Sequence, residues 1–218
     1  MNKVTRPFQF VTASYLTCVE NQRARTLSEL RVCLEQASDD ALFYHTFQSL
    51  GRCHFLTEGF SNDFAQWALA GLNQPVLAEQ LGSIDVRDYL SIADLRRDLV
   101  AIVDGYLRTH ENVGKQEAFE TFHFCRAAGV TCPLPWDAHT LLGFRAGLER
   151  LSHASFHHHF IASRIRLQLR TNDFSHWFSN ALGLNRLAEQ TNRIDIYTNT
   201  LDTARQELAE MIDQEIGP

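Results

Sequence analysis

The sequence lacks the long apolar segments of a membrane protein. No apolar run approaches the roughly 20 residues that a helix needs to cross a bilayer. Residues 1–7, Met-Asn-Lys-Val-Thr-Arg-Pro, contain no apolar core of the kind found in signal peptides. We therefore expect a soluble, cytoplasmic protein with no membrane partner.

Cysteine is scarce and shows no paired spacing. The five cysteines are an odd number, none forms a C-x-x-C motif, and none recurs at a matching position of the internal repeat described below. A disulfide framework or a structural zinc site requires such pairing. The pattern predicts reduced thiols, as expected in a cytoplasm.

An excess of positive charge is also missing. Asp and Glu outnumber Lys and Arg by 26 to 20, which gives a formal net charge of −6. A broad surface for nucleic acid needs an excess of Lys and Arg, so we expect no nucleic-acid partner. The sequence contains no G-x-G-x-x-G or G-x-x-x-x-G-K-[ST] phosphate loop and no readable nucleophile–base–acid pattern. Nothing in it demands catalysis, and whether the protein is an enzyme stays open.

What the sequence does contain is an internal repeat with an offset of 110 residues. Three matched segments share this offset: NDFAQW at 62–67 with NDFSHW at 172–177, LAEQ at 77–80 with 187–190, and Ile-Asp at 84–85 with 194–195. Of the 24 positions in 62–85, 11 are identical in the second copy. Weaker similarity covers most of the chain. We predict two tandem repeats, 1–111 and 112–218, packed about a pseudo-twofold axis as one compact unit.

Helical spacing of apolar residues dominates both copies and predicts an all-α or nearly all-α fold. The first copy is expected to form helices over 26–37, 40–56, 75–82 and 91–109, with one more beginning at 62–63. The second copy is expected to match them at 172–173, 185–192 and 200–215. Side chains suited to capping the helix starts are Thr26, Asn62, Ser91, Asn172 and Thr200.

Three further segments carry local predictions. Residues 8–16 and 118–125 are aromatic and partly alternating, and we expect extended segments or short helices there. Residues 132–136, Cys-Pro-Leu-Pro-Trp, predict a rigid loop, because each proline fixes its own φ and disfavours helix in the residue before it. Asp85 with Arg96 recurs as Asp195 with Arg205, which predicts an ion pair that holds the final helix of each copy.

Two histidines are the most suggestive site candidates. A gapped alignment places His45 opposite His158, each in the middle of a predicted helix between apolar stripes. Neutral imidazole is a common metal ligand and a general base near neutral pH. The alternative is a buried histidine that is hydrogen bonded to a carbonyl or carboxylate of its own copy. The run His157-His158-His159 is weaker evidence, because consecutive helical residues point about 100° apart.

Carboxylates could complete a metal site with these histidines. Asp63 and Asp173 follow the two predicted capping asparagines, so the set His45, His158, Asp63 and Asp173 could hold a divalent transition metal as cofactor. Helix capping explains the same Asn-Asp pairs without any chemistry. Trp67 and Trp177, four residues beyond each aspartate, are interpreted as core anchors rather than as a stacking platform.

A small basic patch is present only in the second copy. Arg164, Arg166 and Arg170 lie on or beside the predicted histidine helix. Together they could bind a small anion, although such runs more often form a solvated helix face.

Several blocks of the chain resemble a prokaryotic family known only as a domain of unknown function. They are the Phe-Tyr-His-Thr-Phe block at 43–47, the Asn-Asp-Phe-Ala-x-Trp block at 62–67, the Ala-Glu-x-x-x-x-Ile-Asp block at 78–85, and their second-copy equivalents, among them Arg-Ile-Arg-Leu at 164–167. The resemblance implies a soluble, mostly helical prokaryotic protein and no known activity. It also implies a second histidine two residues after His45, where this chain has Phe47, and this departure weakens a metal site in the first copy.

Three classes of function follow from these features. The first, which the sequence favours, is a non-enzymatic interaction or regulatory protein with a protein partner, since a duplicated helical unit offers a broad docking surface. The second is a metal- or cofactor-binding protein, with or without enzymatic activity, that uses the histidines between the repeats. The third is a small-anion sensor that uses the three arginines.

Overall fold

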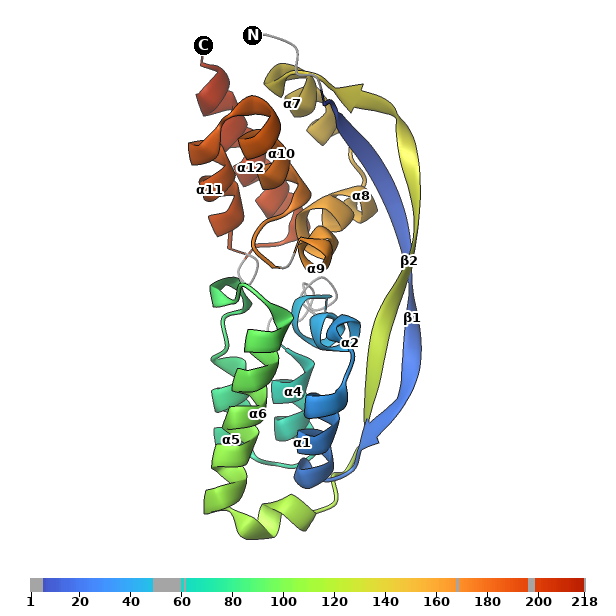
Figure 1. The fold of residues 1–218 in the computed structure, drawn as a ribbon, viewed down its shortest axis with the longest axis vertical. Coiled ribbons are helices and arrows are strands. Elements are labelled where there is room, and N and C mark those ends of the chain that lie inside the picture. Colours follow the sequence, from blue (N-terminus) through green and yellow to red (C-terminus); the bar gives the residue numbers. More distant parts are fainter. Residues whose placement is uncertain (1–5, 49–59, 61, 168, 196–198, 218) are drawn as a thin grey trace. The chain divides into compact units, whose positions relative to one another are not determined.

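The computed structural model describes residues 6–48, 60, 62–167, 169–195 and 199–217. It contains two 17-residue strands, β1 (Phe8–Ala24) and β2 (Phe122–Ala138), which pair as an antiparallel two-stranded sheet beside many helices (Figure 1). The predicted all-α class is therefore wrong, and the fold is mixed α/β. Extended structure was expected only over 8–16 and 118–125, since the remainder of β1 is largely polar and the remainder of β2 contains two prolines, and neither shows the apolar alternation that marks a strand.

The predicted rigid loop at 132–136 is also wrong, because these residues lie inside β2. Proline cannot donate a ladder hydrogen bond, so it is confined to strand edges. In a two-stranded sheet each strand has one edge without a strand partner, which gives Pro133 and Pro135 positions where no N–H is required. The Gln9 amide also donates to the Leu134 carbonyl at 2.9 Å and so ties this segment to β1.

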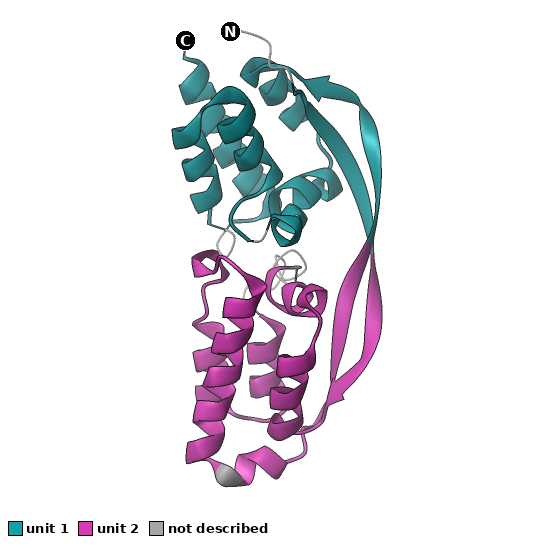
Figure 2. Cartoon of the chain, viewed as in Figure 1, with its two compact units in different colours: residues 1–15, 129–218 teal, residues 16–128 magenta. Residues whose placement is uncertain are grey.

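The chain divides into two compact units whose boundaries cut through both strands (Figure 2). Unit 1 comprises residues 1–15 and 129–218, and unit 2 comprises residues 16–128. The start of the chain thus belongs with the helices of the second half, and the start of β2 belongs with the helices of the first half. The predicted repeats 1–111 and 112–218 are defined by sequence similarity. As domain boundaries they stay a prediction.

Each unit holds a set of helices in the same order. Unit 2 contains α1 (Leu27–Gln36), α2 (Asp39–Phe43), the π-helix η1 (Tyr44–Gln48), α4 (Asp63–Ala70), α5 (Pro75–Gly82), the 3₁₀ turn η2 (Val86–Asp88), α6 (Ile92–Thr109) and the 3₁₀ turn η3 (Glu111–Lys115). Unit 1 contains α7 (Leu141–Glu149), α8 (His153–His157), the π-helix η4 (His158–Ala162), α9 (Ser163–Arg166), α10 (Asp173–Leu182), α11 (Asn185–Arg193) and α12 (Leu201–Ile216).

The predicted helix caps are confirmed. The side chains of Thr26, Ser91 and Thr200 accept hydrogen bonds from the backbone three residues on, at the starts of α1, α6 and α12. Asn62 and Asn172 do the same for α4 and α10. Because a cap satisfies a backbone N–H that the helix leaves unpaired, these residues define where the helices begin.

Aromatic side chains join one strand of each unit, the inner strand, to the helices: β2 in unit 2 and β1 in unit 1. In unit 2 the Phe122 ring packs against Phe64 and Trp67, and in unit 1 the Phe8 ring packs against Phe174 and Trp177. Both tryptophans are only 6% exposed, and each indole donates a hydrogen bond to a strand-side carbonyl, that of Glu120 or Arg6. The tryptophans are core anchors, as predicted.

The predicted ion pair between Asp85 and Arg96 does not form, and Arg205, the predicted partner of Asp195, binds Asp202. Arg96 binds Asp39 instead, and Asp85 binds Arg87. A search of the described helices for one that is long and apolar enough to cross a membrane finds none.

Candidate functional site

His45 joins a helix of unit 2 to its inner strand. It lies in the π-helix η1, and its side chain is 4% exposed. Nδ1 donates to Asp63 Oδ2 at 2.8 Å, and Nε2 accepts from the backbone N–H of Cys125 in β2, also at 2.8 Å. Because a backbone N–H donates to Nε2, that nitrogen carries no proton, and the ring is a neutral Nδ1–H tautomer. Both ring nitrogens of His45 therefore already take part in hydrogen bonds.

Unit 1 repeats this arrangement with His159. Its Nδ1 donates to Asp173 Oδ2 at 2.8 Å, and its Nε2 accepts from the Val11 N–H in β1 at 2.9 Å. The structural counterpart of His45 is therefore His159, and the alignment with His158 was one residue out of register. The helix caps could have revealed this, since His45 and His159 each lie seven residues after the capping serine, Ser38 or Ser152.

His158 takes the place that Tyr44 has in unit 2. Each is the first residue of its π-helix, and each is hydrogen bonded to a hydroxyl on β1. Tyr44 Oη lies 2.9 Å from Thr17 Oγ1, whereas His158 Nδ1 lies 2.6 Å from Tyr15 Oη. Gly129 makes room for this contact, because a Cβ there would come within 2.7 Å of the Tyr15 ring.

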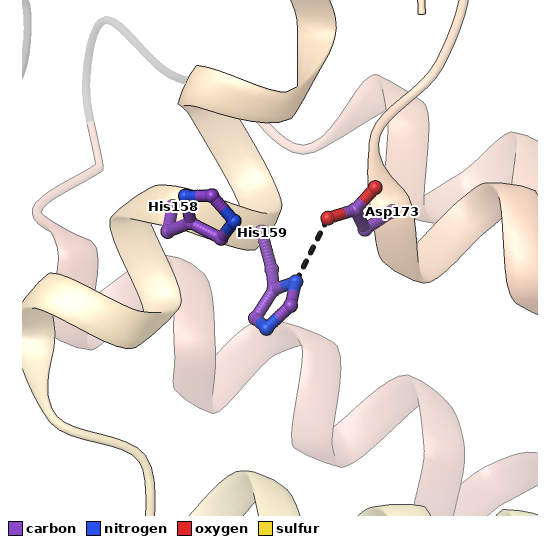
Figure 3. Close-up of side chains that lie close together, drawn as sticks. All are labelled: His158, His159 and Asp173. Atoms are coloured by element: carbon purple, nitrogen blue, oxygen red, sulfur yellow. Dashed lines mark hydrogen bonds and ion pairs between the residues drawn. The ribbon is translucent and has the colours of Figure 1, made fainter. Parts of the chain in front are cut away.

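Three potential metal ligands consequently gather in unit 1 (Figure 3). One ring nitrogen each from His158 and His159 and one oxygen of Asp173 lie within 4.8 Å of one another. The second oxygen of Asp173 is bonded to the Arg166 guanidinium. A metal ion would have to displace the proton or the backbone bond of His159 and would sit beside a fixed positive charge. Since His45 and Asp63 form the same pair in unit 2, the pair itself serves to hold helix to strand.

Burial sets the protonation of this cluster. Burial is the main cause that lowers the pKa of His158 to about 4; the charge of Arg166 acts in the same direction, and that of Asp173 opposes it. Burial alone would raise the pKa of the Asp173 carboxyl, but its bonds with His159 and Arg166 hold that pKa below its ordinary value. Burial likewise raises the pKa of Tyr15 to about 12. At neutral pH the cluster therefore contains a neutral His158, a protonated Tyr15 and an ionised Asp173.

The structure brings some of the predicted site residues together and separates others. His45 contacts Asp63 in unit 2, and His158 lies near Asp173 in unit 1, so the four-residue metal site is divided between the units. A metal site with these four ligands stays a prediction. His159 and Tyr15 are the residues that the sequence reading missed.

The three arginines of the predicted anion site lie in different surroundings. Arg164 is 4% exposed, and its guanidinium lies 5.9 Å from the centre of the Phe160 ring. Arg166 binds Asp173, and Arg170 is exposed. An anion site formed by all three also stays a prediction.

In each unit, one strand segment lies on the side away from the helices and has large exposed apolar residues. The N–H groups of Val11 and Cys125 point at the helices, so β1 is the inner strand of unit 1 and β2 the inner strand of unit 2. The outer strand segments are therefore 16–24 of β1 in unit 2 and 129–138 of β2 in unit 1 (Figure 1). Leu16, Val19 and Val130 on them are 66%, 66% and 72% exposed. In the part of the chain that the structure describes, no third strand pairs with either segment.

Two comparisons with known proteins return a match. The model described as "Family of unknown function (DUF5752)" matches residues 5–213, which confirms the resemblance seen in the sequence motifs. The structure of OrfY from Thermoproteus tenax is similar with a TM-score of 0.85 and 28% identity, over 98% of this chain and 97% of that one. No curated protein matches.

Proposed function

This chain belongs to that family of unknown function, and from its geometry we propose that it is a non-enzymatic interaction protein. It binds an extended segment of a partner protein along its outer strand segments, 16–24 and 129–138. The observation that carries the proposal is the exposure of apolar residues on strands whose outer edges have no strand partner in the described chain.

An open strand edge is a template for another strand. Its backbone N–H and C=O groups point outward in a row, and natural proteins often blunt such edges with charge or proline. Pro133 and Pro135 interrupt this row on 129–138, so the more continuous edge is that of 16–24. A partner segment that adds to the edge gains main-chain hydrogen bonds, while exposed side chains supply selectivity. Leu16 and Val19 offer apolar contacts on one outer segment, and Val130 offers them on the other.

The exposure extends to both faces of the strands. Residues 129–133 are all exposed, as are the neighbours Leu16 and Thr17. Since successive strand residues point to opposite faces, both faces are open at 129–133 and at 16–17, whereas Ala24 and Ala138 at the ends of the segments are buried. A partner can therefore contact the edge and a face at the same time. We place this interaction in the cytoplasm, as the sequence predicts, and the free thiols of Cys18, Cys33 and Cys132 support that placement.

The test uses lysines to block the outer segments. Leu16→Lys, Val19→Lys and Val130→Lys are combined in one variant, and Leu142→Lys on α7, 63% exposed, is the matched control. Partners that the wild-type protein captures from cells of its source are identified, and the affinity of the purified partner is measured for each variant. We expect the triple variant to lose at least about tenfold in affinity and the control to bind normally, because edge lysines oppose strand addition.

Hydrogen exchange provides a second readout. The partner should slow amide exchange within 16–24 or 129–138. Equal binding by both variants, protection confined to the helices, or capture of no partner at all would each refute the proposal.

A further inference from the structure

We infer that unit 1 carries a binding site for a small, neutral, hydroxyl-rich molecule such as a sugar or polyol, in a hollow between α10 and α11. The hollow has a volume of about 370 Å³. That lies at the lower end of the range typical of small-molecule sites. The inference is independent of the strand edges discussed above.

Eight of the nine residues that line this hollow have polar side chains. The nine are Thr171, Ser175, His176, Ser179, Asn180, Asn185, Ala188, Glu189 and Asn192. Hydroxyl and amide groups both donate and accept hydrogen bonds, which suits a ligand whose own hydroxyls do the same. No Lys or Arg is among these residues, and the single carboxylate, Glu189, repels anions. The chemistry therefore favours a neutral polyhydroxylated ligand.

The other copy shows that the fold does not need these polar groups. In unit 2, α4 and α5 begin 110 residues earlier than α10 and α11, so the two helix pairs can be compared position by position. Ala65, Leu69, Ala70, Pro75 and Gly82 stand where unit 1 has Ser175, Ser179, Asn180, Asn185 and Asn192. At these five positions unit 2 has no hydrogen-bonding side chain, whereas His176 and Glu189 correspond to Gln66 and Glu79, which are polar in both copies.

In unit 2 an aromatic side chain packs where unit 1 has polar residues. The Phe60 ring lies so close to Gly82 that a Cβ there would be 2.4 Å from it. The equivalents in unit 1 are Arg170, which is exposed, and Asn192. An aromatic ring covers one copy of the helix pair, and a polar hollow occupies the other.

Ser175 supplies an unsatisfied group at this hollow. It is 1% exposed, and among the described residues its Oγ has no hydrogen-bond partner. A buried hydroxyl without a partner destabilises a protein, and its counterpart Ala65, which is fully buried, shows that a methyl group fits there. Because this Oγ is not accessible to solvent, a ligand hydroxyl would pair with it after the Ser175 side chain turns toward the hollow, and that bond would remove this cost.

Neighbouring side chains are already positioned for recognition. Ser179 Oγ donates to Asn185 Oδ1 at 2.6 Å, which leaves the Asn185 amide N–H groups to face a ligand. Asn172 Nδ2 donates to Asn192 Oδ1 at 3.2 Å, and Asn192 Nδ2 donates to Thr171 Oγ1 at 3.4 Å. Such mutual bonds hold the side chains in place before a ligand arrives and reduce the entropy that binding costs.

The test measures binding of defined probes to the full chain. Glucose, galactose, maltose, sucrose, glycerol and myo-inositol are screened by saturation-transfer NMR, and the binders are quantified by calorimetry. The variants are Ser175→Ala and Asn185→Ala, with Gln190→Ala, an exposed residue of α11 outside the hollow, as the control. We expect at least one probe to bind, about fivefold to tenfold weaker binding by each variant, and unchanged binding by the control.

The melting temperature separates this result from misfolding. Ser175→Ala copies the residue found in unit 2, so it should leave the melting temperature of the ligand-free protein unchanged or raise it. The inference is overturned if no probe binds the wild-type protein, if the two variants bind as well as the control, or if inorganic phosphate binds in preference to the neutral probes.

Discussion

Single residues in this protein are constrained most tightly where helix and strand meet. His45 and His159 each use both ring nitrogens, one for the aspartate at the start of α4 or α10 and one for a strand N–H. Substitution of either histidine should destabilise the fold, because loss of the imidazole would leave a strand N–H and an aspartate carboxylate without this hydrogen-bond partner. The recurrence of this contact in both units marks it as part of the architecture.

Two helical glycines allow a test at the residue scale. A Cβ on Gly147 would lie 2.5 Å from the buried Phe10 ring, whereas a Cβ on Gly105 would meet nothing closer than 3.8 Å. Gly147→Ala should destabilise the protein by about 1–3 kcal/mol, since the ring must move in a packed core. Gly105→Ala should stabilise it by about 0.5–1 kcal/mol, because alanine favours helix over glycine. Urea denaturation of both variants measures the difference, and equal effects would contradict the close approach of β1 to α7.

At the scale of elements, arginine side chains donate hydrogen bonds to backbone carbonyls at the C-terminal ends of helices, which the N-terminal capping residues do not reach. Arg96 on α6 donates to the carbonyls of Leu34 and Ala37 at the end of α1, at 2.8 and 2.7 Å, and also binds Asp39. Arg205 on α12 donates to the Leu151 carbonyl in the same way. The recurrence of these arginines was visible in the sequence, but their partners were not, because the carbonyls that they bind carry no signal in the side-chain pattern.

Removal of this clamp should be costly. Arg96→Ala should lower the free energy of unfolding by about 2 kcal/mol, because it leaves partly buried carbonyls without donors. Arg97→Ala is the matched control on the same helix, and the Arg97 side chain is 68% exposed and paired with Asp94 and Asp98. We expect no measurable change for the control. Similar unfolding midpoints for the two variants would show that Arg96 is a surface ion pair only.

For the whole molecule, each strand contributes one half to unit 1 and the other half to unit 2, and this division decides which fragments can fold. Residues 1–111 contain one complete sequence repeat, but they lack the Cys125 N–H that binds His45 and the Glu120 carbonyl that binds Trp67. Residues 16–128 contain all of unit 2, including both groups. The compact unit and the sequence repeat are therefore different segments of chain.

This difference predicts opposite behaviour for two fragments of similar length. A chain of residues 16–128 should unfold cooperatively on heating, while a chain of residues 1–111 should show little fixed structure. Circular dichroism melts and the dispersion of amide signals in NMR spectra test this. Cooperative folding of 1–111 by itself would mean that the exchanged strands are dispensable.

The sequence alone determined the features that depend on near neighbours. The offset of 110 residues, the capping residues, the starts of α4, α6, α10 and α12 and the burial of the two tryptophans could all be read from it, because caps and helical stripes act over a few positions. The position of His45 and Asp63 as partners also fits the alternative of a histidine bound within its own copy.

The tertiary structure decided everything that joins distant parts of the chain. The pairing of β1 with β2, the exchange of their halves, the equivalence of His45 with His159 and the unsatisfied Ser175 beside a polar hollow all depend on residues far apart in sequence. Strand pairing is a contact between segments more than a hundred residues apart, and its hydrogen bonds run through backbone groups that every residue shares. Side-chain patterns can therefore suggest that a segment is extended, but only the folded chain shows which segment it meets.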